Sequence, residues 1–400
     1  MYSIEFLRKT QNHLLNQITS KFYRFNFGRI NWNQQLIGIK GPRGTGKTTM
    51  MLQYLKYILE PKTSLYASAD NPFFYDNTIF QLAEDWVTMG GRHLILDEVH
   101  KLDKWSNEIK LAHDSFPELQ IIFSSSSALK VYQGEGDLSR RLALYELPGL
   151  SFREFLEFEQ QIHFDTISVK ELFNNHEEIS TKISARIKPV PLFHQYLRSG
   201  YFPFAKELEE QEYFKRLQAV LNAVLEVDLQ HTESYSKSNT LKLKKLLGII
   251  SGLVPFEPNI SKLADRMKIG RVTLLHYLQH LQDARILNFL SQQNKGISVL
   301  QKPDKIYLEN TNLAFSLSEN PEIGNLRETF AISQFKNINL DIVLPKKGDL
   351  LIDGKYLVEI GGKNKTMQQI GDAEDHYLFK DNIETGFARS IPLWLIGFLY

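Results

Sequence analysis

The most constraining feature of the sequence is a glycine-rich stretch, Gly41-Pro42-Arg43-Gly44-Thr45-Gly46-Lys47-Thr48-Thr49, which matches the P-loop pattern G-x-x-x-x-G-K-[ST] at every fixed position. An apolar run at 36–39 precedes it, and residues 49–59 follow with helical spacing. In this order, backbone N–H groups and the helix N-terminus can cradle phosphate oxygens. We therefore expect the stretch to bind a nucleotide, with Lys47 reaching the β- and γ-phosphates and the Thr48 hydroxyl binding Mg²⁺.

A second motif lies downstream, where an apolar run starting at His93 ends in the two acids Asp97 and Glu98. This is the Walker B arrangement, in which Asp97 holds Mg²⁺ through water and Glu98 orients and polarises the attacking water. ATP and Mg²⁺ are thus the expected cofactors. The run Asp97-Glu98-Val99-His100 also fits the D-E-x-H box of helicases, which remains an alternative at this point.

Composition narrows the class of protein. The 400 residues are enough for about two to four domains. A net charge of +1 provides no overall field that would attract nucleic acid or a membrane, so any basic patch must be local. The absence of cysteine excludes disulfides, thiolate catalysis and cysteine-ligated metals, and it is compatible with a reducing compartment.

Neither a secretory signal nor a membrane span is expected. Residues 1–10 carry charges without a long apolar core, and no stretch reaches about 18 apolar residues. The apolar segment Ile391–Tyr400 is too short to cross a bilayer and is predicted to be a buried strand. These features favour a cytoplasmic protein with no membrane partner.

The fold class is predicted to be α/β. Apolar runs indicate further strands at 64–69, 94–96 and 119–123, separated by helix-like segments at 79–89 and 105–112. Strands that alternate with helices predict a parallel sheet covered on both faces, with ligands at the carboxyl ends of its strands.

The chain resembles a family of bacterial and archaeal AAA-superfamily ATPases related to the Cdc6/Orc and STAND branches. Members of this family join a P-loop domain to a winged helix and a restriction-endonuclease-like C-terminal domain. The resemblance covers nearly the whole chain and departs from the family at Ser125 and Ser199, where glycine is more usual. The matching residues are Gly41-Pro42-Arg43, Asp97 to Lys101, Trp105, Ser124 to Ser127, Arg141, Leu150-Ser151-Phe152-x-Glu154-Phe155, Gly200-Tyr201-Phe202-Pro203 and Val358-Glu359-Ile360-Gly361-Gly362-Lys363.

The resemblance implies two more catalytic residues. A polar residue after the strand beside Walker B positions the attacking water in such ATPases, and Ser126 is the first choice here, with Ser125 second. A plain polar turn explains the serine run equally simply. Arg141 is the candidate for stabilising charge on the γ-phosphate, in cis or in trans, against the alternative of an ordinary surface arginine.

Residues 237–290 contain a helix-turn-helix pattern. Helices are predicted at 241–253, 259–267 and 271–281, with the turn at 268–270 and the last helix as the recognition helix. Nine basic and three acidic residues give this region a local charge of +6. DNA contact is therefore expected, with Lys268, Arg271 and His276 as candidates, although winged helices also serve as lids or protein contacts.

The tail resembles the core of PD-(D/E)xK nucleases. Glu328 on a helix, Asp349, and Glu359 on a strand are candidates for a second metal site. The lysine expected two residues after Glu359 is replaced by Gly361, and Lys363 lies further along. A degenerate binding scaffold is therefore favoured over an active nuclease, with an ATPase that regulates a nuclease as an alternative.

The predicted organisation has four parts: a P-loop ATPase domain at 1–156, a helical linker or lid at 157–236, a winged helix at 237–318 and the nuclease-like domain at 319–400. The predicted activity is Mg²⁺-dependent ATP hydrolysis that drives a conformational switch. An ATP-gated module that binds DNA or protein, with self-association included, is the rival from another class. A helicase is disfavoured because residues 160–320 are mostly helical and carry no arginine-rich motif of a second motor domain.

Overall fold

The computed structural model describes residues 3–19, 21–125, 141–228, 237–292, 302–366 and 375–400. The chain forms two compact units, Met1–Pro148 with Val227–Ser234, and Gly149–Glu226 with Tyr235–Tyr400. Among the helices of the described residues, none is both long and apolar enough to span a bilayer.

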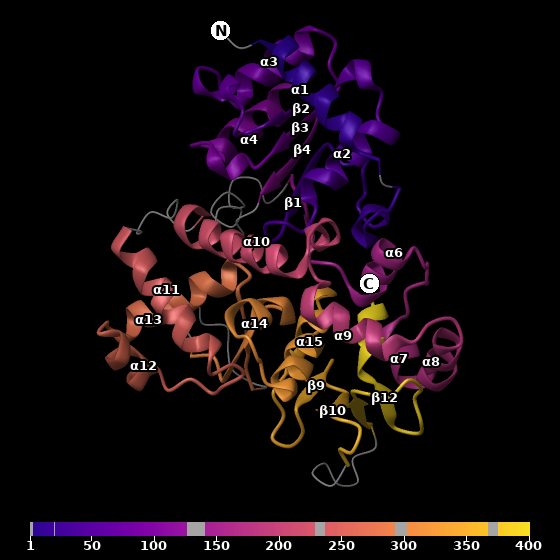
Figure 1. The fold of residues 1–400 in the computed structure, drawn as a ribbon. Coiled ribbons are helices and arrows are strands. Elements are labelled where there is room, and N and C mark those ends of the chain that lie inside the picture. The colour runs from indigo at the N-terminus through magenta and orange to yellow at the C-terminus, as the bar shows by residue number, and fades with distance from the viewer. Residues whose placement is uncertain (1–2, 20, 126–140, 229–236, 293–301, 367–374) are drawn as a thin grey trace. The chain divides into compact units, whose positions relative to one another are not determined.

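The first unit is a parallel sheet between helices, as predicted (Figure 1). The strand order is β2-β3-β4-β1-β5, so β4 separates the P-loop strand β1 from the Walker B strand β3. The described elements are α1 (Ile4–Gln17), β1 (Leu36–Lys40), α2 (Lys47–Tyr57), β2 (Ser64–Ser68), α3 (Ile79–Thr88), β3 (His93–Asp97), α4 (Trp105–Ser115), β4 (Gln120–Ser125) and β5 (Ala143–Glu146).

The central strands are buried on both faces, which explains why their sequences are continuous apolar runs rather than alternating ones. On one face, α3 and α4 share a core with Leu36, Leu94 and Ile121. On the other face, α2 packs on Ile37 and Ile95. The edge strand β5 is only partly buried, and this weaker pattern was not predicted as a strand.

A helix side chain covers the free edge of β2. The Gln11 side chain on α1 accepts a hydrogen bond from Tyr66 N at 2.8 Å and donates to Ser64 O at 3.4 Å. Gln11 is 2% exposed. Its amide therefore takes the place of a neighbouring strand and satisfies backbone groups that an uncovered edge would present to other chains.

The second unit contains two sheets and ten α-helices among its described residues. The elements up to the first sheet are α6 (Phe152–Gln160), α7 (Val169–Asn174), α8 (His176–Ser184), α9 (Pro189–Ser199), α10 (Glu210–Ala223), α11 (Lys237–Ser251), α12 (Ile260–Met267), α13 (Arg271–Asp283), β6 (Leu287–Leu290) and β7 (Lys305–Leu308). Beyond them lie α14 (Thr311–Leu317), α15 (Ile323–Asn337), β8 (Ile342–Val343), β9 (Leu350–Ile352), β10 (Tyr356–Gly361), β11 (His376–Lys380) and β12 (Ser390–Pro392).

The C-terminal sheet of this unit has the order β12-β11-β10-β9-β8 and is mixed. Strands β10, β11 and β12 are parallel, whereas β8, β9 and β10 pair antiparallel. Helices α6 to α9 bury Phe152, Phe173 and Phe193 in the same core as this sheet. Residues expected to form a separate linker therefore share a hydrophobic core with the C-terminal region.

The segment Ile391–Tyr400 is buried as predicted, but the prediction of a strand is wrong for most of it. Strand β12 ends at Pro392, and Leu393–Phe398 forms a 3-10 helix. Proline has no N–H to continue a strand ladder. An apolar run that is buried on all sides also carries no periodicity that separates a strand from a helix.

Two sequence boxes named for the family resemblance pack against one another inside this unit. Ser151 and Glu154 form a reciprocal capping box that starts α6, with both contacts at 3.1 Å. The Leu150 N–H donates to Tyr201 O at 2.8 Å. A Cβ at Gly149 would lie 2.2 Å from the Tyr201 ring, so only glycine allows this approach. Both boxes thus serve packing.

Candidate nucleotide-binding site

The P-loop connects the carboxyl end of β1 to the first turn of α2, where Gly46 is the N-cap. Gly44 and Gly46 have φ of 81° and 93°, in the left-handed region that glycine adopts without strain. A Cβ at Gly41 would lie 2.2 Å from Leu147 O, because the loop passes close to the chain that leaves β5. The predicted stretch Gly41–Thr49 therefore has the backbone that a phosphate cradle requires.

The Lys47 ammonium lies inside this loop. Its Nζ donates to the carbonyl oxygens of Gly41 and Pro42, both at 2.8 Å, and the residue is 5% exposed. The Thr45 hydroxyl also donates to Pro42 O, at 2.9 Å. The loop is thus closed around a positive charge, which is the electrostatic setting that a phosphate group needs.

Arg24 is a supporting residue of the loop that sequence analysis missed. Its guanidinium donates to Thr45 O at 2.5 Å and to Pro148 O at 2.8 Å, and it is 6% exposed. Because Arg24 stands far from the P-loop in sequence and in no motif, no local pattern could have indicated this contact.

Asp97 is the centre of the polar network at this site. Its Oδ2 accepts hydrogen bonds from Thr48 Oγ1 at 2.6 Å and from the Tyr66 hydroxyl at 2.8 Å. Its Oδ1 accepts from Ser124 Oγ. The two residues predicted to hold Mg²⁺, Thr48 and Asp97, are therefore in direct contact, and their oxygens are the hard donors that this ion prefers.

Tyr66 and Ser124 are further functional candidates: the sequence analysis missed Tyr66, and it named Ser124 only as part of the serine run. Burial, together with the neighbouring Asp97 carboxylate, raises the pKa of Tyr66 far above its ordinary value, so its hydroxyl remains a donor. Ser124 also accepts from the Glu98 N–H at 3.0 Å. The pairing register of β3 and β4 could have indicated Ser124. Leu96 pairs with Phe123, so the next residues of the two strands, Asp97 and Ser124, come side by side.

Of the predicted sensor serines, Ser126 lies outside the described residues and stays a prediction. Ser125, the second choice, is fully buried at the end of β4 and pairs in register with Lys40. The serine that contacts Asp97 is Ser124, one position before Ser125.

Glu98 follows β3 in a left-handed backbone conformation with φ of 58°. Its Oε2 lies 2.9 Å from Lys101 Nζ and 3.7 Å from Arg43 Nη2. Burial alone would raise the pKa of the Glu98 carboxyl, but the hydrogen bond from Lys101 and the charges of His100, Lys101 and Arg43 outweigh it and lower the pKa. Glu98 is therefore held as a carboxylate beside the phosphate loop.

Arg141 does not reach this site within its own unit. It lies two residues before β5, whose first pairing is Ala143 with Ile37, near the amino end of β1. The P-loop follows the other end of β1. Arg141 Nε instead contacts Asp114 Oδ1 at 2.9 Å, and the arginine side chain is 36% exposed. The structure thus contradicts a role for Arg141 at the γ-phosphate site of its own chain. A role at the site of another chain stays a prediction.

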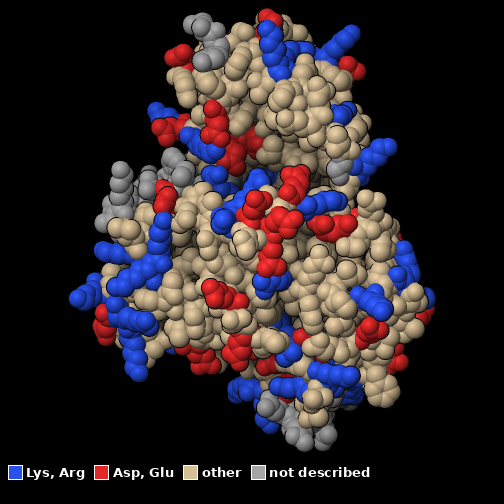
Figure 2. Space-filling model, viewed as in Figure 1, with Lys and Arg blue, Asp and Glu red and all other residues tan. Residues whose placement is uncertain are grey.

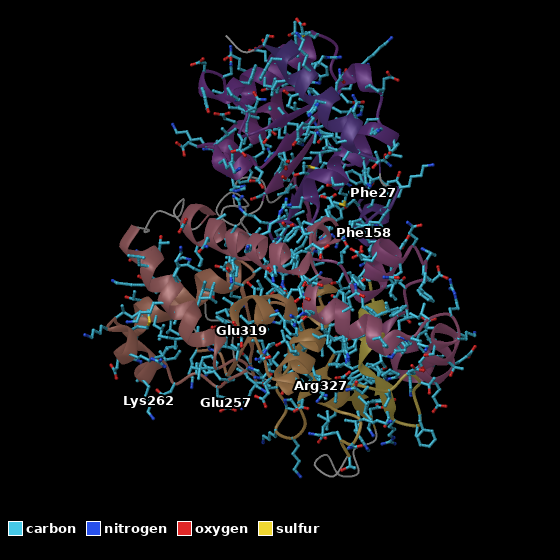
Figure 3. All side chains as sticks on the ribbon, viewed as in Figure 1. Phe27, Phe158, Glu257, Lys262, Glu319 and Arg327 are labelled. Carbon is cyan, nitrogen blue, oxygen red and sulfur yellow. The ribbon has the colours of Figure 1, made fainter. Side chains whose placement is uncertain are left out.

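In the second unit, the predicted helix-turn-helix elements are present as α12, a turn at Lys268 and α13. Asn259 caps α12, and Leu274, Leu278 and Leu281 form the buried face of α13, as expected. The DNA candidates Lys268, Arg271 and His276 are all exposed. Lysine and arginine side chains gather over α11 to α13 (Figure 2), and Lys262 extends outward from α12 (Figure 3).

The carboxylates proposed for a second metal do not form a metal site in the structure. Among the described residues, no three His, Asp or Glu side chains are placed to hold an ion together. Glu328 instead contacts Lys305 Nζ at 2.7 Å and the Tyr307 hydroxyl at 3.0 Å. Asp349 accepts from the Ile360 N–H at 2.7 Å. Burial raises the pKa of Asp349, against the opposing effect of that hydrogen bond.

The lysine nearest Glu359 is Lys365 rather than Lys363. Strand β10 ends at Gly361, Lys363 is exposed in the following turn, and Lys365 Nζ lies 3.6 Å from Glu359 Oε2. A Cβ at Gly361 would lie 2.6 Å from the Lys365 Cβ and Cγ. The lysine stem therefore fills the space above Gly361, which explains why no side chain stands at that position.

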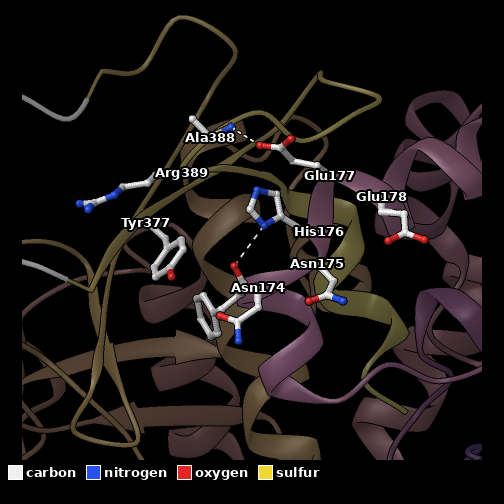
Figure 4. A pocket seen from close by; sticks show the side chains of 9 residues that line it. Asn174, Asn175, His176, Glu177, Glu178, Tyr377, Ala388 and Arg389 are labelled. Carbon is white, nitrogen blue, oxygen red and sulfur yellow. Dashed lines mark hydrogen bonds between the residues drawn. The ribbon is translucent and has the colours of Figure 1, made fainter.

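A separate polar pocket of about 630 Å³ lies in the second unit and contains none of the nucleotide-site residues (Figure 4). His176 Nδ1 is 3.2 Å from Phe173 O there, and the Ala388 N–H donates to Glu177 Oε1 at 2.6 Å. The pocket is lined by Phe173, Asn174, Asn175, His176, Glu177, Glu178, Tyr377, Ala388 and Arg389.

Two sequence families match this chain. Residues 33–156 match a family described as an AAA domain, and residues 190–323 match one described as a domain of unknown function, DUF8612. The first match includes the P-loop, Asp97 and Glu98. Together with the parallel sheet, it identifies residues 33–156 as an AAA-type P-loop domain, and it confirms this part of the family resemblance.

A curated relative is an uncharacterized protein of Methanocaldococcus jannaschii, 26% identical over 270 residues. The alignment covers 64% of this chain and 57% of that protein, so the chain spans a little over half of its relative's length.

Similar solved structures include AMPPCP-bound DnaA from Aquifex aeolicus, at 16% identity, 70% of this chain, 91% of that chain and a TM-score of 0.27. PCH-2 from C. elegans is 12% identical, with 70% and 67% covered and a TM-score of 0.25. The S. cerevisiae Hsp104–ADP complex is 16% identical, with 70% and 41% covered and a TM-score of 0.28. These scores are too low to support a functional conclusion.

Proposed function

Because residues 33–156 form an AAA-type P-loop domain, we propose that the chain binds ATP with Mg²⁺ and hydrolyses it to drive a conformational switch. The observation that supports this most directly is the contact between Thr48 and Asp97 beside the enclosed Lys47 ammonium. In P-loop proteins an ammonium binds the phosphates of a nucleoside triphosphate, and a hydroxyl and a carboxylate bind its cation.

Each residue has a distinct role in this proposal. The loop amides and Lys47 bind the phosphates, and Lys47 exchanges its carbonyl contacts for phosphate oxygens. Thr48 and Asp97 would hold Mg²⁺, which would neutralise phosphate charge. Tyr66 and Ser124 fix the Asp97 carboxylate by hydrogen bonds. These contacts orient the metal-binding oxygens before the nucleotide arrives.

Glu98 acts as the base in hydrolysis. Water oxygen bonds to the γ-phosphorus, and the bond from that phosphorus to the β–γ bridging oxygen breaks to release ADP. Glu98 accepts the proton that water loses and later returns it to phosphate. Its lowered pKa keeps it ionised at neutral pH, although such a carboxylate is a weak base, so positioning must contribute most of its effect.

The test compares steady-state ATP hydrolysis and nucleotide binding in wild type, Glu98→Gln and Lys47→Ala. Glu98→Gln should bind ATP but hydrolyse it at least about a hundredfold more slowly, the lower limit for losing a general base. Lys47→Ala should weaken ATP binding. Equal hydrolysis rates in wild type and Glu98→Gln, or unchanged ATP binding in Lys47→Ala, would contradict these assignments.

A second function, DNA binding, is supported by the surface of the second unit. Helices α11 to α13 followed by the antiparallel pair β6–β7 have the element order of a winged helix. Lys262, Lys268 and Arg271 are exposed there. Phosphate contacts release counterions, so affinity for duplex DNA should fall steeply with salt and weaken in Arg271→Ala. Binding that ignores salt and survives Arg271→Ala with Lys268→Ala would indicate a protein partner.

A further inference from the structure

Four charged side chains of alternating sign connect the turn after β2 to the P-loop. Lys101 contacts Asp70 on one side, and its Nζ lies 2.9 Å from Glu98 Oε2 on the other. The same Glu98 oxygen lies 3.7 Å from Arg43 Nη2. The chain of contacts therefore runs Asp70, Lys101, Glu98, Arg43, with the proposed catalytic base between two cations.

The two contacts to Glu98 differ in strength. Lys101 is three residues after Glu98, within the same short 3-10 turn, and it approaches at hydrogen-bond distance. Asp70 holds its ammonium from the other side. Arg43 approaches only to 3.7 Å, which is beyond a hydrogen bond. The side chains of Arg43, Glu98 and Lys101 are only 18–21% exposed, so water screens these contacts incompletely.

Arg43 follows Pro42, whose carbonyl oxygen lies 2.8 Å from the Lys47 ammonium. In the proposed function this ammonium would meet the terminal phosphates, so a γ-phosphate would compete with Glu98 for Arg43. A guanidinium binds a phosphate with short, charge-assisted hydrogen bonds, which are stronger than a 3.7 Å ion pair. A nucleoside diphosphate adds no γ-phosphate and leaves the Arg43–Glu98 contact in place.

We propose that Lys101 is a positioning residue for Glu98, and that Arg43 distinguishes ATP from ADP by leaving Glu98 for the γ-phosphate. This inference rests on the proposed ATPase function. Once Arg43 has moved, Glu98 keeps Lys101 as its partner, and Asp70 keeps Lys101 in place. The carboxylate is then fixed on one side only and can face water. Hydrolysis therefore depends on Lys101, whereas the preference for the triphosphate depends on Arg43.

The role of Lys101 is tested with Lys101→Met and the charge-conserving Lys101→Arg. Lys101→Met should lower kcat by about 10- to 100-fold, the range for losing a residue that orients a functional group, while the Kd for ATP stays unchanged. Lys101→Arg should recover most of the lost kcat. A wild-type kcat in Lys101→Met, or an equal loss in both variants, would overturn the positioning role.

The role of Arg43 is tested by equilibrium binding of ADP and of a non-hydrolysable ATP analogue, so that no turnover is involved. Arg43→Met should reduce the preference for the triphosphate by about tenfold or more, the effect of losing one charged hydrogen bond. Arg43→Lys, which keeps the charge, should lose less. Equal weakening of both nucleotides by Arg43→Met would overturn this role.

Comparison with Glu98→Gln separates a failure of the proposed ATPase function from a failure of the inference about Lys101 and Arg43. If Glu98→Gln hydrolyses ATP as fast as wild type, the proposed function fails. If Glu98→Gln is inactive while Lys101→Met keeps a wild-type kcat and Arg43→Met weakens ADP and the triphosphate equally, only the present inference is overturned. A kcat loss confined to Lys101→Met and a lost preference confined to Arg43→Met support it.

Discussion

Lys336, near the end of α15, is a partly buried lysine whose pKa is lowered to about 8. Burial is the main cause because it disfavours the charged form, and the nearby Arg285 adds to the shift while Glu309 opposes it. Its Nζ donates to Phe289 O at 2.6 Å. The second unit therefore contains a lysine that loses its proton in a mildly alkaline solution.

This shift predicts how stability depends on pH. In the unfolded chain a lysine keeps its proton up to about pH 10.4, so between about pH 8 and 10.4 the unfolded state binds more protons. Lys336 should thus make the free energy of unfolding rise with pH, by at most about 1.4 kcal/mol per pH unit. Urea unfolding of wild type and Lys336→Met across this range checks it. A difference between them that does not change with pH would contradict the prediction.

Ser124 is predicted to matter for catalysis more than for nucleotide binding. Its hydroxyl links the Asp97 carboxylate to the Glu98 N–H, so Ser124→Ala removes one contact from the Asp97 side chain and one from the Glu98 backbone. We expect kcat for ATP hydrolysis to fall by about 10- to 100-fold, the range for losing an orienting contact. ADP affinity should stay near wild type because the P-loop is intact. Unchanged hydrolysis would show that the strand itself orients both acids.

Helix α1 covers the β2 edge of the first sheet with the Gln11 side chain. Gln11→Leu should lower the free energy of unfolding by about 1–3 kcal/mol, because the buried Tyr66 N–H loses its acceptor. Asn12→Leu, on the exposed side of the same helix, is the matched control. Thermal unfolding and light scattering measure the effects on stability and on edge-to-edge association. Equal shifts in the two variants would show that the edge contact contributes nothing.

The elements of the first unit could be predicted because their signals are local. The glycine loop and the acids after His93–Leu96 each sit at a strand end, and the apolar runs are long enough to indicate buried strands. Strand β5 was missed although Leu142–Tyr145 is a short apolar run, because an edge strand is only partly buried and its sequence pattern is a weaker signal. Its place beside β1 depends on a distant pairing.

The site was predictable only where a motif fixes both residue and role. Thr48 and Asp97 meet as expected. Arg24 and Tyr66 come from other elements, and only the folded chain brings them to the P-loop or to Asp97. Lys101 lies within the sequence match around Asp97 and Glu98, but its contact with Glu98 appears only in the structure. Arg141 was assigned from its sequence neighbourhood, whereas its position before β5 directs it to Asp114.

For the whole molecule, the proposed switch requires that the two units influence each other. Duplex DNA should therefore change the rate of ATP hydrolysis if the second unit binds it, and the change should disappear as salt rises. Arg271→Ala combined with Lys268→Ala should lose this response. An ATPase rate that is the same with and without DNA at low salt would leave the two activities uncoupled.

The C-terminal region is predicted not to cleave DNA with Mg²⁺ or Mn²⁺, with or without ATP. Glu328 is already engaged by Lys305 and Tyr307, which removes one carboxylate from the set that a nuclease metal needs. Plasmid nicking is the measurement. Cleavage by wild type that is lost in both Asp349→Ala and Glu359→Ala would prove the prediction wrong.

The close approach of Tyr201 to Gly149 also has a consequence for how this sequence can diverge. A Cβ at Gly149 would meet the Tyr201 ring at 2.2 Å, and the three nearest atoms all belong to that ring. The ring is rigid and almost fully buried, so it cannot turn aside. A larger residue at Gly149 is tolerable only when Tyr201 is replaced by a smaller residue in the same lineage. The two positions should therefore change together or not at all among related chains.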